Sequence, residues 1–340
     1  MPRHRFWIRW EENLMVTLKT YTMSRWRFYF AVLGCLLFAG GPSAQAQRFA
    51  TRVFDEVSVI HGILFNRAEN IAGEMKELRA DLYEPYHDTM ARRPLVITVF
   101  GGAFVAGSRD YADMVAIADT LAHHGFVVAS IDYRLVPTLS ISPTNMMRGA
   151  YMATQDVSAA IRFFKAKSDH YGIDTTAIFL LGNSAGSIAS LYTVFMKNDE
   201  RPEEAYLGGD LGMLDDSGLD ISRGHTSRVA GIVAQWGGVS DLEVIDADET
   251  TPICMIHGTA DKTVPYTSGT SGIYAIVSPK LYGSYSIAQR MDSLGMKHYE
   301  LHPFEGESHA FYFGSKYRLI PEKLDACLKI AIDFLCRHLR

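Results

Sequence analysis

Apolar residues along this chain gather in short continuous runs, and between most of these runs the apolar positions recur every three or four residues. A short unbroken apolar run is typical of a strand buried on both faces, whereas the spaced pattern is typical of a helix with one apolar side. Eight runs are predicted to be strands: residues 53–60, 78–83, 95–100, 127–131, 178–181, 229–235, 253–256 and 299–302.

The order of these elements predicts the fold class. Helical segments separate most strands from the third onward, which favours a mostly parallel sheet covered by helices on both faces. One such helix, residues 153–167, is apolar on one side, and Pro321 suits the first turn of the last helix. The first two strands, joined by residues 66–76, are predicted to form an antiparallel hairpin at one edge. We therefore expect an α/β fold with one eight-stranded, mostly parallel sheet.

The five residues Gly182-Asn183-Ser184-Ala185-Gly186 follow one of the predicted strands and open a helix-compatible stretch. A serine on a sharp strand-to-helix turn adopts a strained backbone, so the residues two positions away must be very small. This pattern is typical of a nucleophile elbow. A glycine-bounded turn without chemistry would look the same, so the remaining parts of a catalytic site must be found elsewhere in the chain.

A glycine-rich loop follows the predicted strand that ends at Phe100, with the sequence Gly101-Gly102-Ala103-Phe104. Small residues let a substrate carbonyl approach the main chain, so the N–H groups of Gly102 and Ala103 are candidate oxyanion donors. The N–H of Ala185, just after the candidate nucleophile, would join them. A plain glycine turn is the alternative.

A candidate acid and a candidate base follow two later strands. Asp261 comes after the strand 253–256, and His309 comes after the strand 299–302. Loops at the carboxyl edge of a parallel sheet lie together, so these side chains can meet Ser184 there. Asp241, after the sixth predicted strand, competes for the role of the acid, and Asp261 is preferred because of its loop.

The order Ser184, Asp261, His309 differs from that of the chymotrypsin and subtilisin types. From about residue 53 to its end, the chain resembles the α/β-hydrolase superfamily, specifically carboxylesterases and acetyl-xylan or feruloyl esterase-like members. Residues 130–135 and the helix 156–165 also match. The resemblance implies an α/β-hydrolase fold and a serine carboxylic-ester hydrolase that works through these three residues and an acyl-enzyme.

Three positions depart from the family pattern. Relatives often carry histidine and a third glycine where this chain has Phe100 and Ala103, and they often carry an acidic residue where it has Asn183. The backbone donors survive these changes, so the shape of the acyl pocket is affected rather than catalysis. We expect a pocket for short acyl groups on soluble, aryl or carbohydrate-linked esters. Its predicted walls are Phe100, Phe104, Pro265, Tyr266 and Phe311.

Other functions use similar elements. A serine peptidase needs the same three residues but usually adds a large gate domain, and a binding domain could keep the fold with its chemistry unused. A nucleotide site is excluded because the glycines at 101–107 lack the G-x-G-x-x-G spacing and the lysine of a P-loop. Residues 198–227, rich in aspartate and glycine, form either a small lid or a solvated loop.

The first 46 residues are interpreted separately from the predicted catalytic domain, residues 47–340. An apolar stretch at 28–38 follows basic residues and precedes an A-x-A site ending at Ala46, which is typical of a cleaved secretory signal peptide. We expect a secreted or periplasmic protein without a stable membrane span, because the stretch is short for a bilayer. Lipid attachment at Cys35 is not favoured, since apolar residues continue beyond it.

Composition limits the partners. The chain has 340 residues, 48% hydrophobic and 21% charged, enough for a full core. After residue 46 it carries 27 basic and 36 acidic side chains, a net charge of −9, which argues against nucleic acid. No metal or cofactor motif is found. Cys254, Cys327 and Cys336 would remain after cleavage, an odd number that favours inert thiols over a disulfide.

Overall fold

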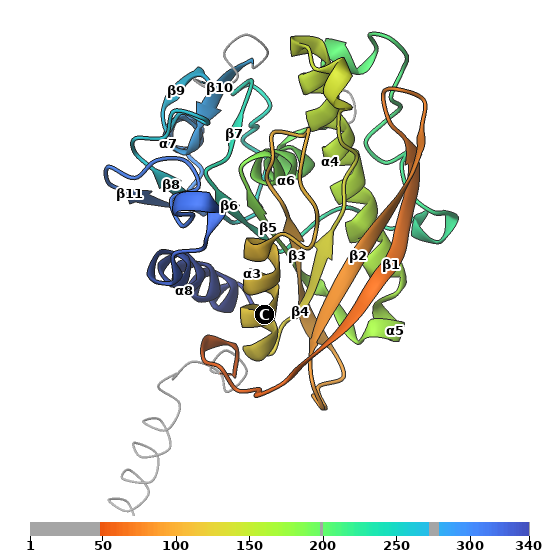
Figure 1. The fold of residues 1–340 in the computed structure, drawn as a ribbon, viewed down its shortest axis with the longest axis vertical. Helices are drawn as coiled ribbons and strands as arrows, with labels where there is room; N and C mark the ends of the chain where they lie inside the picture. The colour runs from red at the N-terminus through yellow and green to blue at the C-terminus, as the bar shows by residue number, and fades with distance from the viewer. Residues whose placement is uncertain (1–47, 198–199, 272–278, 340) are drawn as a thin grey trace, which may run out of the picture. The chain divides into compact units, whose positions relative to one another are not determined.

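The computed structural model describes residues 48–197, 200–271 and 279–339. The predicted signal peptide, residues 1–46, lies outside these ranges. One eight-stranded sheet organises the described chain, with the strand order β1-β2-β4-β3-β5-β6-β8-β11 (Figure 1). Its strands are β1 (Val57–Glu69), β2 (Met75–Pro85), β3 (Arg93–Val99), β4 (Val127–Ile131), β5 (Ile173–Asn183), β6 (Gly231–Gln235), β8 (Ile253–Gly258) and β11 (Tyr299–Phe304).

The sheet is mixed, with its antiparallel part at one edge. β1 and β2 form the predicted hairpin, and β2 also pairs with β4 in antiparallel fashion. From β4 to β11 all neighbouring strands are parallel. The α/β class and the mostly parallel eight-stranded sheet are therefore confirmed. Every residue of β3, β4, β6 and β8 is buried, which explains why these strands appear in the sequence as unbroken apolar runs.

Helices cover both faces of this sheet. In Figure 1, α3 and α8 lie in front of the strands, and α4 passes behind β1 and β2. Pro321 begins the last helix at its first position, as predicted. Among the described residues, no helix is both long and apolar enough to span a bilayer. The helices are α3 (Ala112–His123), α4 (Pro143–Ala166), α5 (Ser168–Tyr171), α6 (Ala185–Phe195), α7 (Ser284–Ser293) and α8 (Pro321–Arg337).

Helix α4 begins ten residues earlier than predicted. Ser142 caps it by accepting a hydrogen bond from the backbone N–H of Asn145 at 3.1 Å, and Pro143 occupies the first turn. The helix therefore begins at this cap, which apolar spacing alone does not locate. Position 149 of this helix requires glycine, because a Cβ there would lie 2.5 Å from the side chain of Val136.

Residues 200–230 form an irregular segment with two short 3₁₀ turns, Glu203–Ala205 and Asp220–Ser222. Side chains of α4 bind its backbone carbonyls. Tyr151 donates to the carbonyl of Gly212 at 2.9 Å, and Gln155 donates to that of Leu211 at 2.7 Å. These bonds fasten the described part of the predicted lid or loop along α4.

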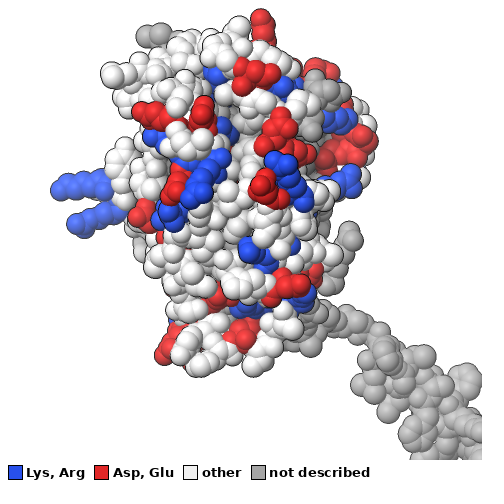
Figure 2. All heavy atoms as spheres, turned by 90° about the vertical axis from the view of Figure 1, so that its right-hand side faces the viewer, with Lys and Arg blue, Asp and Glu red and all other residues white. Residues whose placement is uncertain are grey.

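A second, three-stranded sheet has the order β7-β10-β9. It consists of β7 (Gly238–Val239), β9 (Ser268–Thr270) and β10 (Lys280–Gly283). This sheet was not predicted, because strands this short show no periodic pattern of apolar residues. On the face shown in Figure 2, basic and acidic side chains are interspersed. Cys254, Cys327 and Cys336, the cysteines within the described ranges, are free thiols. Burial raises the pKa of Cys327 to about 12 and that of Cys336 to about 11, so both stay protonated near neutral pH.

Candidate active site

Ser184 stands at the turn between β5 and α6 with a φ of 50° and a ψ of −120°, a strained conformation for a residue with a side chain. The two flanking glycines permit this turn. A Cβ on Gly182 would lie 2.5 Å from the carbonyl oxygen of Gly186, and a Cβ on Gly186 would lie 2.1 Å from that of Val99. The elbow is thus as tight as the sequence pattern predicts.

The structure brings Ser184, His309 and Asp261 together from three loops. The Oγ of Ser184 lies 2.9 Å from Nε2 of His309, and Nδ1 of His309 lies 2.7 Å from Oδ2 of Asp261. Nδ1 faces a carboxylate and therefore donates. Nε2 is then the unprotonated nitrogen of the neutral ring, placed to accept the serine proton.

Asp261 is buried and held by main-chain donors. Its Oδ1 accepts hydrogen bonds from the N–H groups of Thr263 at 2.7 Å and Val264 at 3.0 Å. Burial alone would raise the pKa of this carboxyl, but hydrogen bonds from His257 and His309 outweigh burial and lower the pKa to about 2. Asp261 is therefore ionised at neutral pH.

His257 is a neighbour of this group that the sequence analysis did not single out. Its Nε2 lies 2.9 Å from the carbonyl oxygen of Val264 and 3.2 Å from Oδ2 of Asp261, so this nitrogen donates. Its Nδ1 lies 2.8 Å from the hydroxyl of Ser284. The ring is fully buried and contacts the same carboxylate oxygen of Asp261 as His309 does. The sequence does offer a signal for His257, because it lies near the end of β8, four residues before Asp261.

Asp241, the competing acid, lies elsewhere. It is exposed, and its Oδ1 accepts a hydrogen bond from the N–H of Glu243 at 3.0 Å within its own loop. The carboxylate that forms a hydrogen bond with His309 is that of Asp261.

The candidate oxyanion donors sit beside Ser184. Gly102 and Ala103 have φ angles of 125° and 54°, and a Cβ on Gly102 would lie 2.0 Å from the carbonyl oxygen of Ala106. This conformation leaves the N–H groups of Gly102, Ala103 and Ala185 without a hydrogen-bond partner among the described residues. All three residues line the hollows beside Ser184. Their donors are available to a ligand oxygen.

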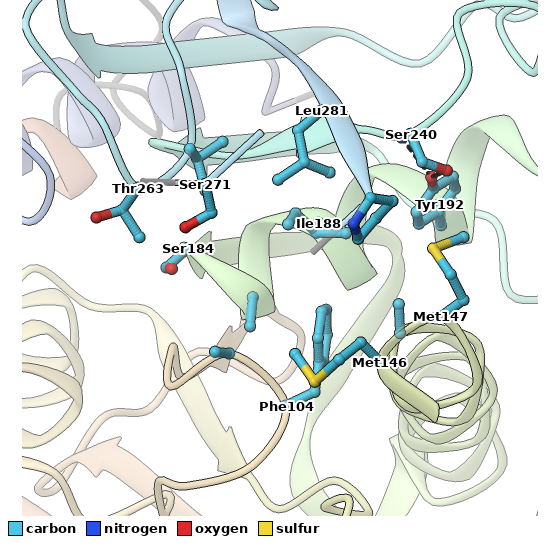
Figure 3. A pocket seen from close by; sticks show the side chains of 15 residues that line it. Phe104, Met146, Met147, Ser184, Ile188, Tyr192, Ser240, Thr263, Ser271 and Leu281 are labelled. Atoms are coloured by element: carbon cyan, nitrogen blue, oxygen red, sulfur yellow. Dashed lines mark hydrogen bonds between the residues drawn. The ribbon is translucent and has the colours of Figure 1, made fainter. Parts of the chain in front are cut away.

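Two cavities meet at Ser184. The first is a narrow, mainly apolar pocket of about 70 Å³ between α4, α6 and β10, seen in Figure 3. The second is an open cleft of about 760 Å³ on the side of His309, with the aromatic residues Tyr111, Trp236, Phe313 and Tyr317 in its walls. A group bound at Ser184 can therefore extend in two directions, one confined and one wide.

Comparison with known proteins places the chain in a family. The model of the family described as BD-FAE matches residues 80–251, half of the chain. The chain belongs to the BD-FAE family. It is a carboxylesterase-like α/β-hydrolase.

Individual proteins similar to this BD-FAE chain agree with that class. The probable isoprenylcysteine alpha-carbonyl methylesterase ICMEL1 of Arabidopsis thaliana is 29% identical over 171 residues, 50% of this chain and 31% of that protein. Esterase LipC of Mycobacterium tuberculosis is 36% identical over 106 residues, 31% of this chain and 24% of LipC. The chain thus covers about a third or less of the length of these relatives.

A solved structure extends the likeness over most of the described fold. Esterase 2 of Thermogutta terrifontis, with propionate bound, has a TM-score of 0.55 and 22% identity to the BD-FAE chain, covering 81% of this chain and 94% of that one. At this identity the likeness shows the α/β-hydrolase fold.

The walls of the apolar pocket differ from the prediction. Phe104 lines the pocket as expected. The ring of Phe100 instead stacks on Tyr133 with centroids 4.2 Å apart, and Phe311 stacks on Phe304 at 4.5 Å. The side chains next to a site residue in the sequence can point to either side of their loop. Closeness in sequence to a site residue is therefore not enough to predict that a side chain lines the pocket. The prediction that Phe100, Pro265, Tyr266 and Phe311 form walls of the pocket is wrong.

A buried polar network lies under the elbow and accounts for Asn183. The Nδ2 of Asn183 donates to Oδ2 of Asp113 at 2.6 Å and to the hydroxyl of Tyr312 at 3.0 Å. Tyr312 in turn lies 3.1 Å from Asp113. Burial raises the pKa of Asp113, although its hydrogen bonds act in the opposite direction. An acidic residue at position 183 would place a second carboxylate against Asp113, so the amide fits this network better.

Metal-ligating side chains approach one another at one place in the described part of the BD-FAE chain. Ligand atoms of Cys254, Glu300 and His302 lie within 4.8 Å of one another on β8 and β11. Both carboxylate oxygens of Glu300 already accept hydrogen bonds from Arg337, at 2.6 and 2.7 Å. This group forms part of the packing of α8 on the sheet.

Proposed function

We propose that this protein is a secreted serine carboxylic-ester hydrolase for short-chain acyl esters, including carbohydrate-linked acetyl groups. The observation that carries the proposal is the hydrogen-bonded series from Ser184 through His309 to the ionised Asp261, which opens onto unpaired backbone donors. A nucleophile, a base with its orienting acid, and oxyanion donors are the parts that acyl transfer requires.

The geometry supports a two-step reaction. Nε2 of His309 takes the proton as Oγ of Ser184 attacks the ester carbonyl. The N–H groups of Gly102, Ala103 and Ala185 stabilise the negative oxygen of the tetrahedral intermediate. His309 then gives its proton to the leaving alcohol, and an acyl-enzyme forms on Ser184. Water repeats the sequence with His309 as base and releases the carboxylic acid.

The two cavities accommodate different parts of the substrate. The narrow pocket is mainly apolar and small, so it suits the acyl group and limits its length. The wide cleft suits the alcohol, because its aromatic walls can stack on an aryl group or the apolar face of a sugar. The neighbouring Thermogutta structure with propionate bound is consistent with a small acyl group in this fold.

Acyl chain length provides the direct test of this proposal. We expect kcat/KM for acetyl, butyryl, octanoyl and palmitoyl aryl esters to fall along the series, with the optimum at about two to four carbons, because a pocket of about 70 Å³ excludes a long chain. Dipeptidyl anilides should not be turned over. A phosphonate reagent should label Ser184 and no other residue by mass spectrometry. A maximum at palmitoyl, or label at another serine, would contradict the proposal.

The pH profile tests the assignment of the base. We expect kcat/KM to fall as the solution becomes acidic, because a protonated His309 can no longer accept the proton of Ser184. Asp261 adds nothing to this limb. Its pKa is lowered from 3.8 to about 2, so the stability that it contributes is present above pH 3.8 and is lost only as the pH falls through about 2. A kcat/KM that did not fall at acid pH would argue against His309 as base.

Secretion is the remaining part of the proposal. It is supported by the apolar stretch and the A-x-A site in residues 1–46. Protein isolated from its host should then begin at or near Gln47. An N-terminus at Met1 or Met23 would contradict the proposed processing.

A further inference from the structure

A second cavity, of about 100 Å³, adjoins the acyl pocket at the end away from Ser184. The two hollows share four lining residues, which form the wall between them: Met147, Ala150, Tyr192 and Ser240. Figure 3 shows Tyr192, Ser240 and Met147 at the far end of the acyl pocket, with Ile188 between them and Ser184. The pocket therefore ends at a thin partition with more space behind it.

Tyr192 is the largest and most firmly held part of this partition. Its hydroxyl accepts a hydrogen bond from the N–H of Ser240 at 2.7 Å and bonds the hydroxyl of the same residue at 2.7 Å. Its side chain is buried on α6, the helix that Ser184 begins. The eight residues from Ser184 to Tyr192 span about 12 Å of helix axis, so the ring stands at a fixed depth from the nucleophile.

The other large side chain of the partition is less restrictive. Met147 is an unbranched thioether that can change rotamer at little energetic cost, so a longer acyl chain could displace it. Displacing the Tyr192 ring would break both hydrogen bonds to Ser240 inside the protein, where their loss is expensive.

We propose that Tyr192 is the residue that sets acyl-chain specificity, by closing the acyl pocket against the second cavity. This inference rests on the proposed function, because it takes the narrow pocket as the acyl site. Removing the ring would join the two hollows into one longer channel. Apolar side chains of the second cavity, among them Met196 and Val244, would then line the path of a longer chain.

The test compares the ratio of kcat/KM for an octanoyl ester to that for an acetyl ester in Tyr192→Ala and in the wild type. We expect the ratio to rise at least about tenfold, since even one methylene gained in an apolar pocket changes specificity by about that factor. Active sites are counted by phosphonate labelling of Ser184, so only folded enzyme enters the rates. If Tyr192→Ala does not fold, Tyr192→Leu, which still removes the ring, is measured in its place with the same expectation.

Two control variants separate the partition from general loosening. Tyr192→Phe keeps the ring and should keep the preference for short chains. Tyr151→Ala removes an equally buried tyrosine that lines only the second cavity, so its ratio should equal that of the wild type. The proposal is overturned if the ratio for the Tyr192 variant stays within about twofold of wild type, or if Tyr151→Ala raises it equally. In either case the wild-type enzyme would still hydrolyse acetyl esters, whereas failure of the proposed function would leave every variant inactive.

Discussion

Replacing Ser184 by alanine is expected to lower kcat on acetyl esters by about a millionfold, the loss measured when the nucleophile of the well-studied protease subtilisin is removed. The Oγ of Ser184 lies 2.9 Å from Nε2 of His309, and no other hydroxyl among the described residues forms a hydrogen bond with His309. Without it no acyl-enzyme can form. The measurement is the steady-state rate on an aryl acetate with a large excess of enzyme.

Ser187→Ala is the matched control for this change. Ser187 lies one turn further along α6, is fully buried and has no hydrogen-bond partner for its hydroxyl in the described structure. Its loss should leave the rate within about twofold of wild type. Both variants should unfold at the wild-type temperature. If Ser184→Ala keeps a tenth of the wild-type rate, Ser184 is not the nucleophile.

The main sheet could be predicted from the sequence because burial on both faces leaves an unbroken apolar run. β4 was predicted to the residue, and every strand of the large sheet overlaps a predicted one. Errors arose where another signal replaced the apolar pattern. β1 is half-exposed and continues to Glu69, well beyond its predicted end. The start of α4 depends on the cap at Ser142 rather than on apolar spacing.

The meeting of Ser184, Asp261 and His309 was predictable for a topological reason. Each follows a parallel strand, β5, β8 or β11, and the carboxyl ends of such strands lie at one edge of the sheet. A motif at each strand end is therefore enough to predict that the three side chains approach one another.

The surroundings of these residues could not be predicted in the same way. Whether Phe100 faces the pocket or stacks on Tyr133 depends on side-chain direction after the strand has ended. At the end of the narrow pocket, Tyr192 is held by hydrogen bonds to Ser240, a residue 48 positions further along the chain. Such contacts arise from packing between segments that are distant in sequence, and no local pattern encodes them.

Replacing Asp261 by asparagine is expected to lower kcat by about ten-thousandfold, the effect known for the corresponding change in a serine protease. The contacts of this carboxylate explain why. Oδ1 accepts two backbone N–H groups, from Thr263 and Val264, so the amide oxygen must take that position. The amide nitrogen then replaces Oδ2 and points its hydrogens at Nδ1 of His309.

In that arrangement Nδ1 of His309 must accept, so the ring proton moves to Nε2 and the base can no longer take the proton of Ser184. Asp241→Asn is the control, because its exposed side chain accepts a hydrogen bond from its own loop and has no bond to His309 among the described residues, and we expect activity within about twofold of wild type. The comparison is made by kcat on an aryl acetate, with the unfolding temperature recorded for both variants. If Asp241→Asn were the damaging change and Asp261→Asn the mild one, the acid would be the other carboxylate. A loss on Asp261→Asn that a higher pH fully restored would instead mean that the carboxylate only tunes the basicity of His309 and does not select its tautomer.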